Sequence, residues 1–391
     1  MHLTRRSAMA AGLATLAFPA AAFAADSAKR LVVIVLRGGM DGLGAVVPVG
    51  DPAYVAARGP LAMDAGDLLP LDATFRLHPR LATLHALYGA GDLLVAHAVA
   101  TPYRERSHFD AQNMLETGGA RPYARDSGWL NAALGALGGA AKGGRRELGL
   151  AIAAQAPLLL RGTASVATWS PSPMPDADAD TLARLMDLYA ARDPALAGAL
   201  DSAITANAIA ADAGGMTGGM RGGGRALAPL AKAAAGFLRR PDGPVAAVIE
   251  MSGWDTHANQ GTAAGALANS LALLDGGVAA LKADLGPVWA DTVMVIATEF
   301  GRTVSPNGNR GTDHGTASAL FLAGGAVAGG RVVADWPGLA PGQRHEGRDL
   351  RATTDVRAVL KGVLADHLGA SGTTIFPDST GVAAMGGLIR A

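Results

Sequence analysis

The most regular pattern along the chain is a set of short, unbroken apolar runs. The first, at residues 31–36, has six consecutive aliphatic residues and stands shortly before a pair of glycines. Runs of this length that lack polar alternation predict strands that are buried on both faces of a sheet. Comparable runs predict further strands at residues 93–99, 245–251, 292–298 and 319–323.

Stretches with helical spacing of apolar positions lie between and after these runs. They cover residues 80–89, 107–117, 178–192, 226–238, 262–285 and 354–367. Strands that alternate with helices predict an α/β fold with a mostly parallel central sheet and helices on both faces. In such a sheet, functional sites form beyond the carboxyl ends of the strands.

The first 24 residues have the layout of an export signal. Arg5 and Arg6 form a charged start, residues 8–22 are apolar and rich in alanine, and Ala22-Phe23-Ala24 is typical of a cleavage site. The paired arginines predict passage through the twin-arginine export machinery, with an ordinary secretory signal as the alternative. The mature protein is then expected to be periplasmic or secreted, with no integral membrane segment after signal removal.

We interpret residues 25–391 as one large domain with a helical insertion around residues 176–224. A proline-rich loop at residues 170–175 precedes this insertion, and a glycine-rich stretch at residues 214–224 ends it. The predicted division is therefore a signal peptide at residues 1–24 followed by a single α/β domain.

Composition narrows the possible partners. The formal charge of zero becomes −2 once Arg5 and Arg6 are removed, so nothing in the charge balance predicts nucleic-acid binding. The chain has no cysteine, which excludes disulfides and thiol chemistry. Five tryptophans and five tyrosines are few for a large sugar-binding platform.

Polar residues are concentrated in the loops that follow the predicted strands. Asp41 lies after the first strand among glycines, where it would act either as a ligand for a hard metal or as a turn-forming residue. Ser107 falls where a helix should begin, so it is either a helix cap or a nucleophile. Arg104, Arg106 and His108 beside it favour an anion site, because guanidinium groups fit tetrahedral oxyanions.

Two further loops carry candidate metal ligands. Asp255 and His257 are two residues apart on an extended segment, so both side chains project to the same side and can reach one metal. The alternative is a hydrogen-bonded Asp–His pair. Glu299 ends a buried strand, where a carboxylate must either bind a cation or form an ion pair, for instance with Arg302. His314 lies in a loop of small residues.

Together these loops predict a divalent-metal site. Its candidate ligands lie at strand ends along one edge of the sheet and are Asp41, Asp255, His257, Glu299 and His314. Their mixture of oxygen and nitrogen donors suits zinc, manganese or a similar ion.

Several runs of sequence resemble the bacterial family called domain of unknown function 1501. The runs are LRGGMDGLGAVVPVGDPAY, SHFDAQNMLETG, SGWDTHANQ, TEFGRTVSPNGNRGTDHGTASALFLAGGAVAGGRV and DWPGL. The family is placed in the alkaline-phosphatase-like superfamily, with sulfatases, phosphatases and cofactor-independent phosphoglycerate mutases. The resemblance therefore implies an alkaline-phosphatase-like fold with an ester-hydrolysing site.

The resemblance also implies roles for individual residues. Asp41 resembles the first-strand metal aspartate, Ser107 the nucleophile at the helix start, and His314 the last metal histidine of the superfamily. Asp255 and His257 resemble the Asp and His of one metal site, although their spacing is shorter than usual. Glu299-Phe300 replaces an Asp-His pair, and Arg302 would supply positive charge where a metal is missing. One or two ions of zinc, manganese or calcium would follow.

Two classes of function are compatible with these observations. The first is a metal-dependent hydrolase of phosphate or sulfate esters, acting on a small-molecule or glycan ester, in which Ser107 attacks and Arg104 or Arg106 holds the non-bridging oxygens. The second is a secreted binding or assembly protein that kept the fold and lost the chemistry. Metal content distinguishes the two.

Overall fold

The structure is a computed structural model that describes residues 29–137, 145, 147–172, 177–214 and 227–391. The predicted signal peptide and nearly all of the glycine-rich stretch lie outside the described residues. The centre is a nine-stranded sheet in the order β11-β5-β10-β9-β1-β8-β6-β7, with β12 also paired to β5. The strands are β11 (Arg331–Val333), β5 (Leu93–Ala100), β10 (Ser318–Ala323), β9 (Thr292–Thr298), β1 (Arg30–Arg37), β8 (Ala246–Ser252), β6 (Gly149–Ile152), β7 (Val166–Trp169) and β12 (Thr354–Asp355).

Strand direction determines which loops meet. β10 is antiparallel to its neighbours β5 and β9, and all the other pairs in this sheet are parallel. The carboxyl ends of β5, β9, β1 and β8 therefore lie along one edge. Because β10 runs the opposite way, its beginning lies at that same edge. The predicted fold class, a mostly parallel α/β sheet, is confirmed.

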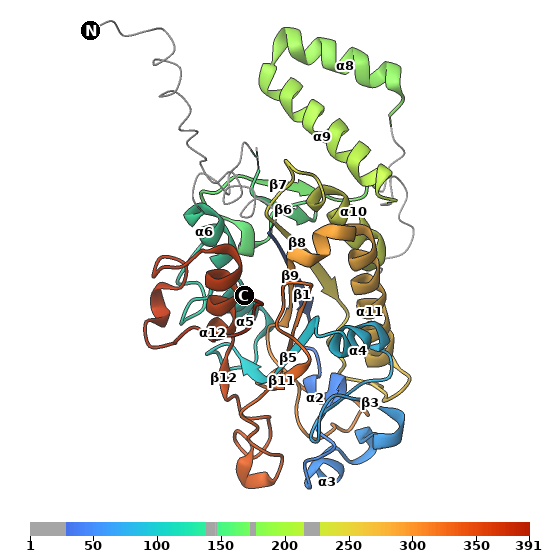
Figure 1. The fold of residues 1–391 in the computed structure, drawn as a ribbon, viewed down its shortest axis with the longest axis vertical. Coiled ribbons are helices and arrows are strands. Elements are labelled where there is room, and N and C mark those ends of the chain that lie inside the picture. The colour runs from blue at the N-terminus through green and yellow to red at the C-terminus, as the bar shows by residue number, and fades with distance from the viewer. Residues whose placement is uncertain (1–28, 138–144, 146, 173–176, 215–226) are drawn as a thin grey trace, which may run out of the picture.

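Helices cover both faces of the sheet (Figure 1). Val32, Ile34 and Leu36 of β1 belong to a core on one face, and the alternate residues Leu31 and Val33 belong to a core on the other. The first face is covered by α4 (Ala82–Gly89), α10 (Leu227–Leu238) and α11 (Ala266–Leu285), and the second by α5 (His108–Thr117), α6 (Trp129–Ala136) and α12 (Val356–Val363). This two-sided burial explains why β1 is apolar throughout.

Smaller elements lie outside these layers. A second sheet has the order β2-β4-β3, formed by β2 (Val46–Val47), β4 (Arg76–Leu77) and β3 (Leu69–Pro70), next to the short helices α2 (Gly42–Ala45) and α3 (Tyr54–Arg58). Two helices, α8 (Ala179–Arg192) and α9 (Pro194–Asp212), form a hairpin at the top of Figure 1. They fall within the predicted insertion, whose boundaries stay a prediction.

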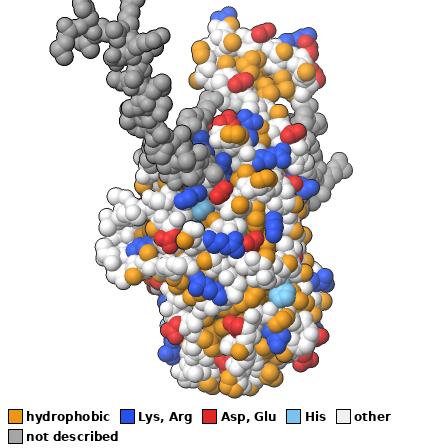
Figure 2. Space-filling view, viewed as in Figure 1, with side chains coloured by type: hydrophobic (Ala, Val, Ile, Leu, Met, Phe, Trp, Pro, Cys, Tyr) orange, Lys and Arg blue, Asp and Glu red, His pale blue; other side chains and the backbone are white. Residues whose placement is uncertain are grey.

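Five predicted strands correspond to β1, β5, β8, β9 and β10, and the short strands at the sheet edges were not predicted. The helix expected at residues 262–285 begins only at Ala266, and the one expected at residues 354–367 is divided into α12 and a π-helical turn, η6 (Leu364–Leu368). Within the described part of the chain, no helix is both long and apolar enough to cross a bilayer. Acidic and basic side chains are interspersed over the face shown in Figure 2.

Candidate metal centre

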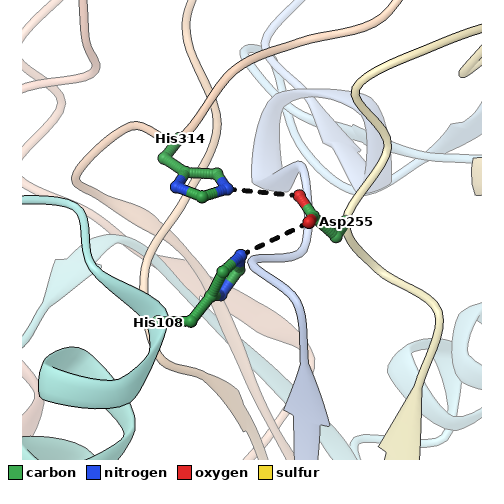
Figure 3. Close-up of side chains that lie close together, drawn as sticks. All are labelled: His108, Asp255 and His314. Atoms are coloured by element: carbon green, nitrogen blue, oxygen red, sulfur yellow. Dashed lines mark ion pairs between the residues drawn. The ribbon is translucent and has the colours of Figure 1, made fainter.

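Four side chains from three separate loops meet at the carboxyl edge of the sheet. His108 is the first residue of α5, a few residues beyond β5, while Asp255 and His257 lie in the segment after β8. His314 lies in the segment that leads into β10. Figure 3 shows the rings of His108 and His314 both directed at the carboxylate of Asp255. The antiparallel direction of β10 is what brings His314 to this edge.

Three members of this group, His108, Asp255 and His314, lie close enough together to share one cation, and His257 lies beside them. Nε2 of His257 and Nε2 of His314 lie 3.0 and 3.3 Å from Oδ1 of Asp255, and Nε2 of His108 lies 3.5 Å from Oδ2. The Nε2 atoms of His257 and His314 are 2.9 Å apart. One ligand atom from each of His108, Asp255 and His314 lies within 4.8 Å of the other two.

The second ring nitrogen, Nδ1, has its own hydrogen-bond partner in all three histidines. The pairs are His108 with Oε1 of Glu299 at 2.9 Å, His257 with Oδ1 of Asp313 at 3.0 Å, and His314 with the backbone carbonyl oxygen of Arg106 at 2.9 Å. An acceptor at Nδ1 holds the ring proton there and leaves Nε2 with a lone pair. All three Nε2 atoms therefore offer lone pairs toward Asp255.

The residues present fit a divalent cation. Nε2 of His108 is buried and has no hydrogen-bond partner, which is costly for a polar atom unless a ligand satisfies it. The lone pairs of His257 and His314 face each other at 2.9 Å, an arrangement that either a bound cation or a shared proton stabilises. The imidazole nitrogens of His108 and His314, together with the Asp255 carboxylate, form a ligand set that is common for transition-metal ions in proteins.

One buried arginine balances part of the negative charge. Nη1 of Arg302 donates to Oδ1 of Asp255 at 2.6 Å, and the rest of its guanidinium is held by Thr312. Burial would raise the pKa of Asp255, but the hydrogen bond and the charge of Arg302 outweigh it and lower the pKa. The hydrogen bond to Glu299 raises the pKa of His108, whereas burial lowers the pKa of His314.

A protein-family model matches most of the chain. The model of the family described as "Protein of unknown function (DUF1501)" matches residues 91–367, well over half of the chain. The chain belongs to the DUF1501 family. The matched region contains the metal-type group, by which we mean His108, Asp255, His257 and His314. It also contains the three partners of the histidine Nδ1 atoms. The resemblance seen in the sequence is confirmed.

Two solved structures are similar to this DUF1501 protein at low identity. One is the C-terminal periplasmic domain of EcEptC from Escherichia coli in complex with zinc, at 11% identity and a TM-score of 0.36, covering 75% of this chain and 72% of that one. The other is the phosphonate monoester hydrolase of Agrobacterium radiobacter, at 13% identity and a TM-score of 0.39, covering 88% and 74%. No curated protein matches the chain.

Asp41 lies apart from the metal-type group of this DUF1501 protein, contrary to the sequence expectation. It is fully buried, and Oδ1 accepts the backbone N–H of Leu43 at the start of α2. Oδ2 accepts from Arg58 at 2.5 Å and from Gln260 at 2.6 Å. Both oxygens are thus used within the protein, because the carboxylate caps a helix and neutralises a buried arginine.

Glu299 also takes a different part from the one expected. Its Oε1 accepts hydrogen bonds from the backbone N–H of Gly38 at 2.8 Å, from Gln112 at 3.0 Å and from His108 at 2.9 Å. Burial would raise the pKa of Glu299, but these donors, His108 first, lower it below its usual value. The ionised carboxylate therefore orients His108 and does not itself join the metal-type group.

The two predicted anion-binding arginines, Arg104 and Arg106, and the predicted charge-supplying Arg302 all have partners within the protein. Arg104 donates from Nη1 to the carbonyl oxygens of Thr101 and Tyr103. Arg106 pairs with Asp349 at 2.8 Å and with Glu346 at 2.5 Å, and Arg302 pairs with Asp255. The contacts of Arg104 and Arg106 use only part of each guanidinium group, so the expectation that one of them holds an oxyanion stays a prediction.

Ser107 stands at the expected position, immediately before α5. Its backbone is extended and its side chain makes no capping hydrogen bond to the first turn of the helix. His108 is the ligand candidate that sequence reasoning missed. It was noted only as a basic residue beside Ser107, yet its place at the start of the helix after β5 was the available signal.

Proposed function

We propose that this protein is an exported, metal-dependent hydrolase of phosphate or sulfate esters. The observation that carries the proposal is the convergence of three histidine Nε2 atoms on Asp255, each ring held by a separate partner at Nδ1. An arrangement of this kind fixes ring orientation and leaves lone pairs in place for a metal. Hydrogen bonds within the protein do not by themselves require three histidine Nε2 atoms around one carboxylate.

The donor set points to the class of ion. His108, His257 and His314 supply nitrogen, and Asp255 supplies oxygen. Zinc and manganese accept such mixed sets, whereas calcium takes oxygen ligands almost exclusively. A second ion would need ligands such as Asp41, whose oxygens are used elsewhere. We therefore favour one ion of zinc or manganese over calcium.

Such an ion, when bound, would polarise the ester and favour ionisation of a nearby hydroxyl. Ser107 is the proposed nucleophile, since it adjoins His108 and its hydroxyl does not cap α5. Its Oγ forms a bond to phosphorus or sulfur while the bond to the alcohol oxygen breaks, and the hydroxyl proton ends on the released alcohol. Water then cleaves the Ser107 ester and restores the hydroxyl. Backbone N–H groups at the start of α5 are suited to the non-bridging oxygens.

A binding or assembly protein without catalysis is the second candidate. The ion pair between Arg302 and Asp255 favours it, because the guanidinium competes with a metal for Oδ1. The engagement of Arg104 and Arg106 by other partners favours it too, since part of each guanidinium group is already used within the protein.

Export rests on the N-terminal sequence. Arg5, Arg6 and the apolar residues 8–22 support passage through the twin-arginine machinery to the periplasm or beyond. Changing both arginines to lysine should leave the uncleaved precursor in the cytoplasm. A cleaved and exported double variant would contradict this route.

Metal content tests the hydrolase proposal. We expect the mature protein to hold about one zinc or manganese ion per chain by elemental analysis, and His108→Ala and Asp255→Ala to lose it. His85→Ala is the matched control, because that histidine lies on α4, where its Nε2 pairs with the carbonyl oxygen of Pro70. Retention of the wild-type metal content by both site variants would place the metal elsewhere.

Turnover then separates the two functions. The metal-loaded protein should hydrolyse 4-nitrophenyl phosphate or 4-nitrophenyl sulfate, and Ser107→Ala should keep the metal while losing activity by on the order of 10³-fold or more. Metal binding without turnover across a broad panel of esters would favour the binding role. Absence of metal after supplementation would sink the hydrolase proposal.

A further inference from the structure

The first turn of α5 carries an exposed aromatic residue directly beside the metal-type group. Phe109 follows His108 in the chain, and 79% of its side chain is exposed. Tyr123, at 65%, is the other aromatic residue among the strongly exposed large apolar side chains of the described residues. Leaving such rings in water forgoes the free energy of burying them. Isolated exposed apolar residues are common, so the exposure of these two rings does not by itself indicate a function.

Helix geometry places Phe109 on the side of α5 that faces the strand ends. Phe109, Gln112 and Glu116 are spaced i, i+3 and i+7 and therefore lie along one face of the helix. Gln112 donates to Glu299 at the end of β9, and Glu116 pairs with Arg37 at the end of β1 at 2.8 Å. Phe109 continues this row toward solvent. This row of residues leads to the same sheet edge as the metal-type group.

Two tyrosines flank the same helical turn. The hydroxyl of Tyr103 donates to Oδ2 of Asp110 at 2.8 Å, and the Asp110 side chain raises the pKa of Tyr123. The backbone N–H of Tyr123 is held by Oδ1 of Asn113 at 2.8 Å, in a left-handed conformation with φ of 57°. The Tyr103 ring and the Tyr123 backbone are therefore anchored beside the start of α5, which carries Phe109.

We propose that Phe109 and Tyr123 form a platform for the organic group of the substrate, and that this group carries an aromatic ring. The inference rests on the proposed hydrolase function and names the substrate class of the same site. The ester group would lie at the metal-type centre while its aromatic ring stacks on Phe109. Aromatic pairs are stabilised beyond their buried area, so an aryl ester would be preferred over a small alkyl ester.

Binding of inert analogues tests the platform without relying on turnover. Metal-loaded wild type, Phe109→Ala and Tyr123→Ala are titrated calorimetrically with phenylphosphonate and methylphosphonate, and in parallel with benzenesulfonate and methanesulfonate. Wild type should bind the phenyl compound of at least one pair about three- to tenfold more tightly than its methyl partner. Phe109→Ala should abolish this preference while leaving the affinity for the methyl compound within about twofold.

Two controls show that the loss is local. Metal content should be unchanged in Phe109→Ala, which demonstrates an intact metal centre. Leu188→Ala removes an apolar side chain of 54% exposure from α8, which Figure 1 shows at the far end of the molecule from α5, and it should keep the preference.

The outcomes distinguish the two proposals. Equal affinity for phenyl and methyl compounds in the wild type, or a preference that survives both aromatic substitutions, overturns the platform and leaves the hydrolase proposal standing. If the metal-loaded wild type binds none of the four compounds, the hydrolase proposal is overturned and the platform with it.

Discussion

At the scale of single residues, the orientation of the metal-type group depends on partners that are not ligands. Glu299, Asp313 and the carbonyl oxygen of Arg106 each hold one histidine ring through Nδ1. The backbone of Arg106 is left-handed, with φ of 65°, and its guanidinium is tied to Asp349 and Glu346. These ion pairs help to hold an unfavourable backbone conformation that aims the carbonyl oxygen at His314.

Glu299→Gln tests the part played by the buried partner of His108. The amide keeps the size of the side chain but removes the negative charge that holds the Nδ1 proton of His108. We expect the affinity for zinc or manganese to fall by about 10- to 100-fold, the usual effect of removing such a partner. Competition with a chelator of known affinity measures it.

A surface carboxylate supplies the comparison for Glu299→Gln. Glu346→Gln removes a charge that is 61% exposed and contacts Arg106, so it should change metal affinity far less. Equal losses in the two variants would show that net charge, and not the orientation of His108, sets the affinity.

Some of these residues were predictable from sequence and others were not. Asp255, His257 and His314 follow or precede apolar strands, so their position at the sheet edge could be inferred. Asp41 has the same sequence signal, yet its carboxylate forms an ion pair with Arg58, which lies 17 residues away in the chain. The contact that keeps Asp41 out of the site is tertiary, and the pattern of residues around Asp41 in the sequence does not predict it.

At the scale of elements, the group depends on how closely the loops after β1 and β8 approach each other. Gly38, just beyond β1, has φ of 122°, and its backbone N–H and carbonyl oxygen bond to Glu299 and Arg302. A Cβ atom at this position would lie 2.6 Å from the backbone nitrogen of Asp255. Glycine is therefore required both by conformation and by space.

Gly38→Ala should displace the Asp255 segment and weaken the fold at the same time. We expect unfolding to become easier by on the order of 2–4 kcal/mol, from backbone strain plus the clash with Asp255. Metal content should fall with it, because Asp255 moves. Gly66→Ala is the control, since nothing lies within 4 Å of the added atom and its φ is not positive. An unchanged denaturation midpoint in Gly38→Ala would contradict this account.

The elements themselves were predictable to different degrees. The long apolar strands β1, β5, β8, β9 and β10 could be located because two-sided burial leaves an unmistakable run. The short strands β6, β7, β11 and β12 have two to four residues each and were missed, since so few residues carry no periodicity. The antiparallel direction of β10, on which the position of His314 depends, is set by pairing and is not visible in the sequence.

At the scale of the whole molecule, buried histidines link stability to pH. His367 lies in the π-helical turn η6 with 1% of its surface exposed, and Nε2 is 2.8 Å from the carbonyl oxygen of Arg30 at the start of β1. Burial lowers its pKa from 6.5 to about 4, although the hydrogen bond to Arg30 opposes the shift. The ring therefore stays neutral in the folded protein under mildly acidic conditions.

The sign of the pH effect follows from proton counting. Between pH 6.5 and about 4, the unfolded chain protonates His367 and the folded protein does not. The unfolded state thus binds more protons, so the free energy of unfolding rises with pH across this window and falls on acidification. The stabilisation is fully present above pH 6.5, and about 2 kcal/mol of it should be lost by pH 5.

His367→Gln isolates this contribution. The glutamine amide can still donate to the carbonyl oxygen of Arg30 but does not titrate. Between pH 7 and pH 5, the unfolding free energy of the variant should therefore fall by about 2 kcal/mol less than that of the wild type. Denaturant unfolding in the presence of a chelator measures both proteins free of metal. His85→Gln, on the surface of α4, should follow the wild-type profile. Parallel pH profiles for His367→Gln and wild type would mean that His367 is already protonated in the folded state at pH 5, and that burial does not keep its ring neutral.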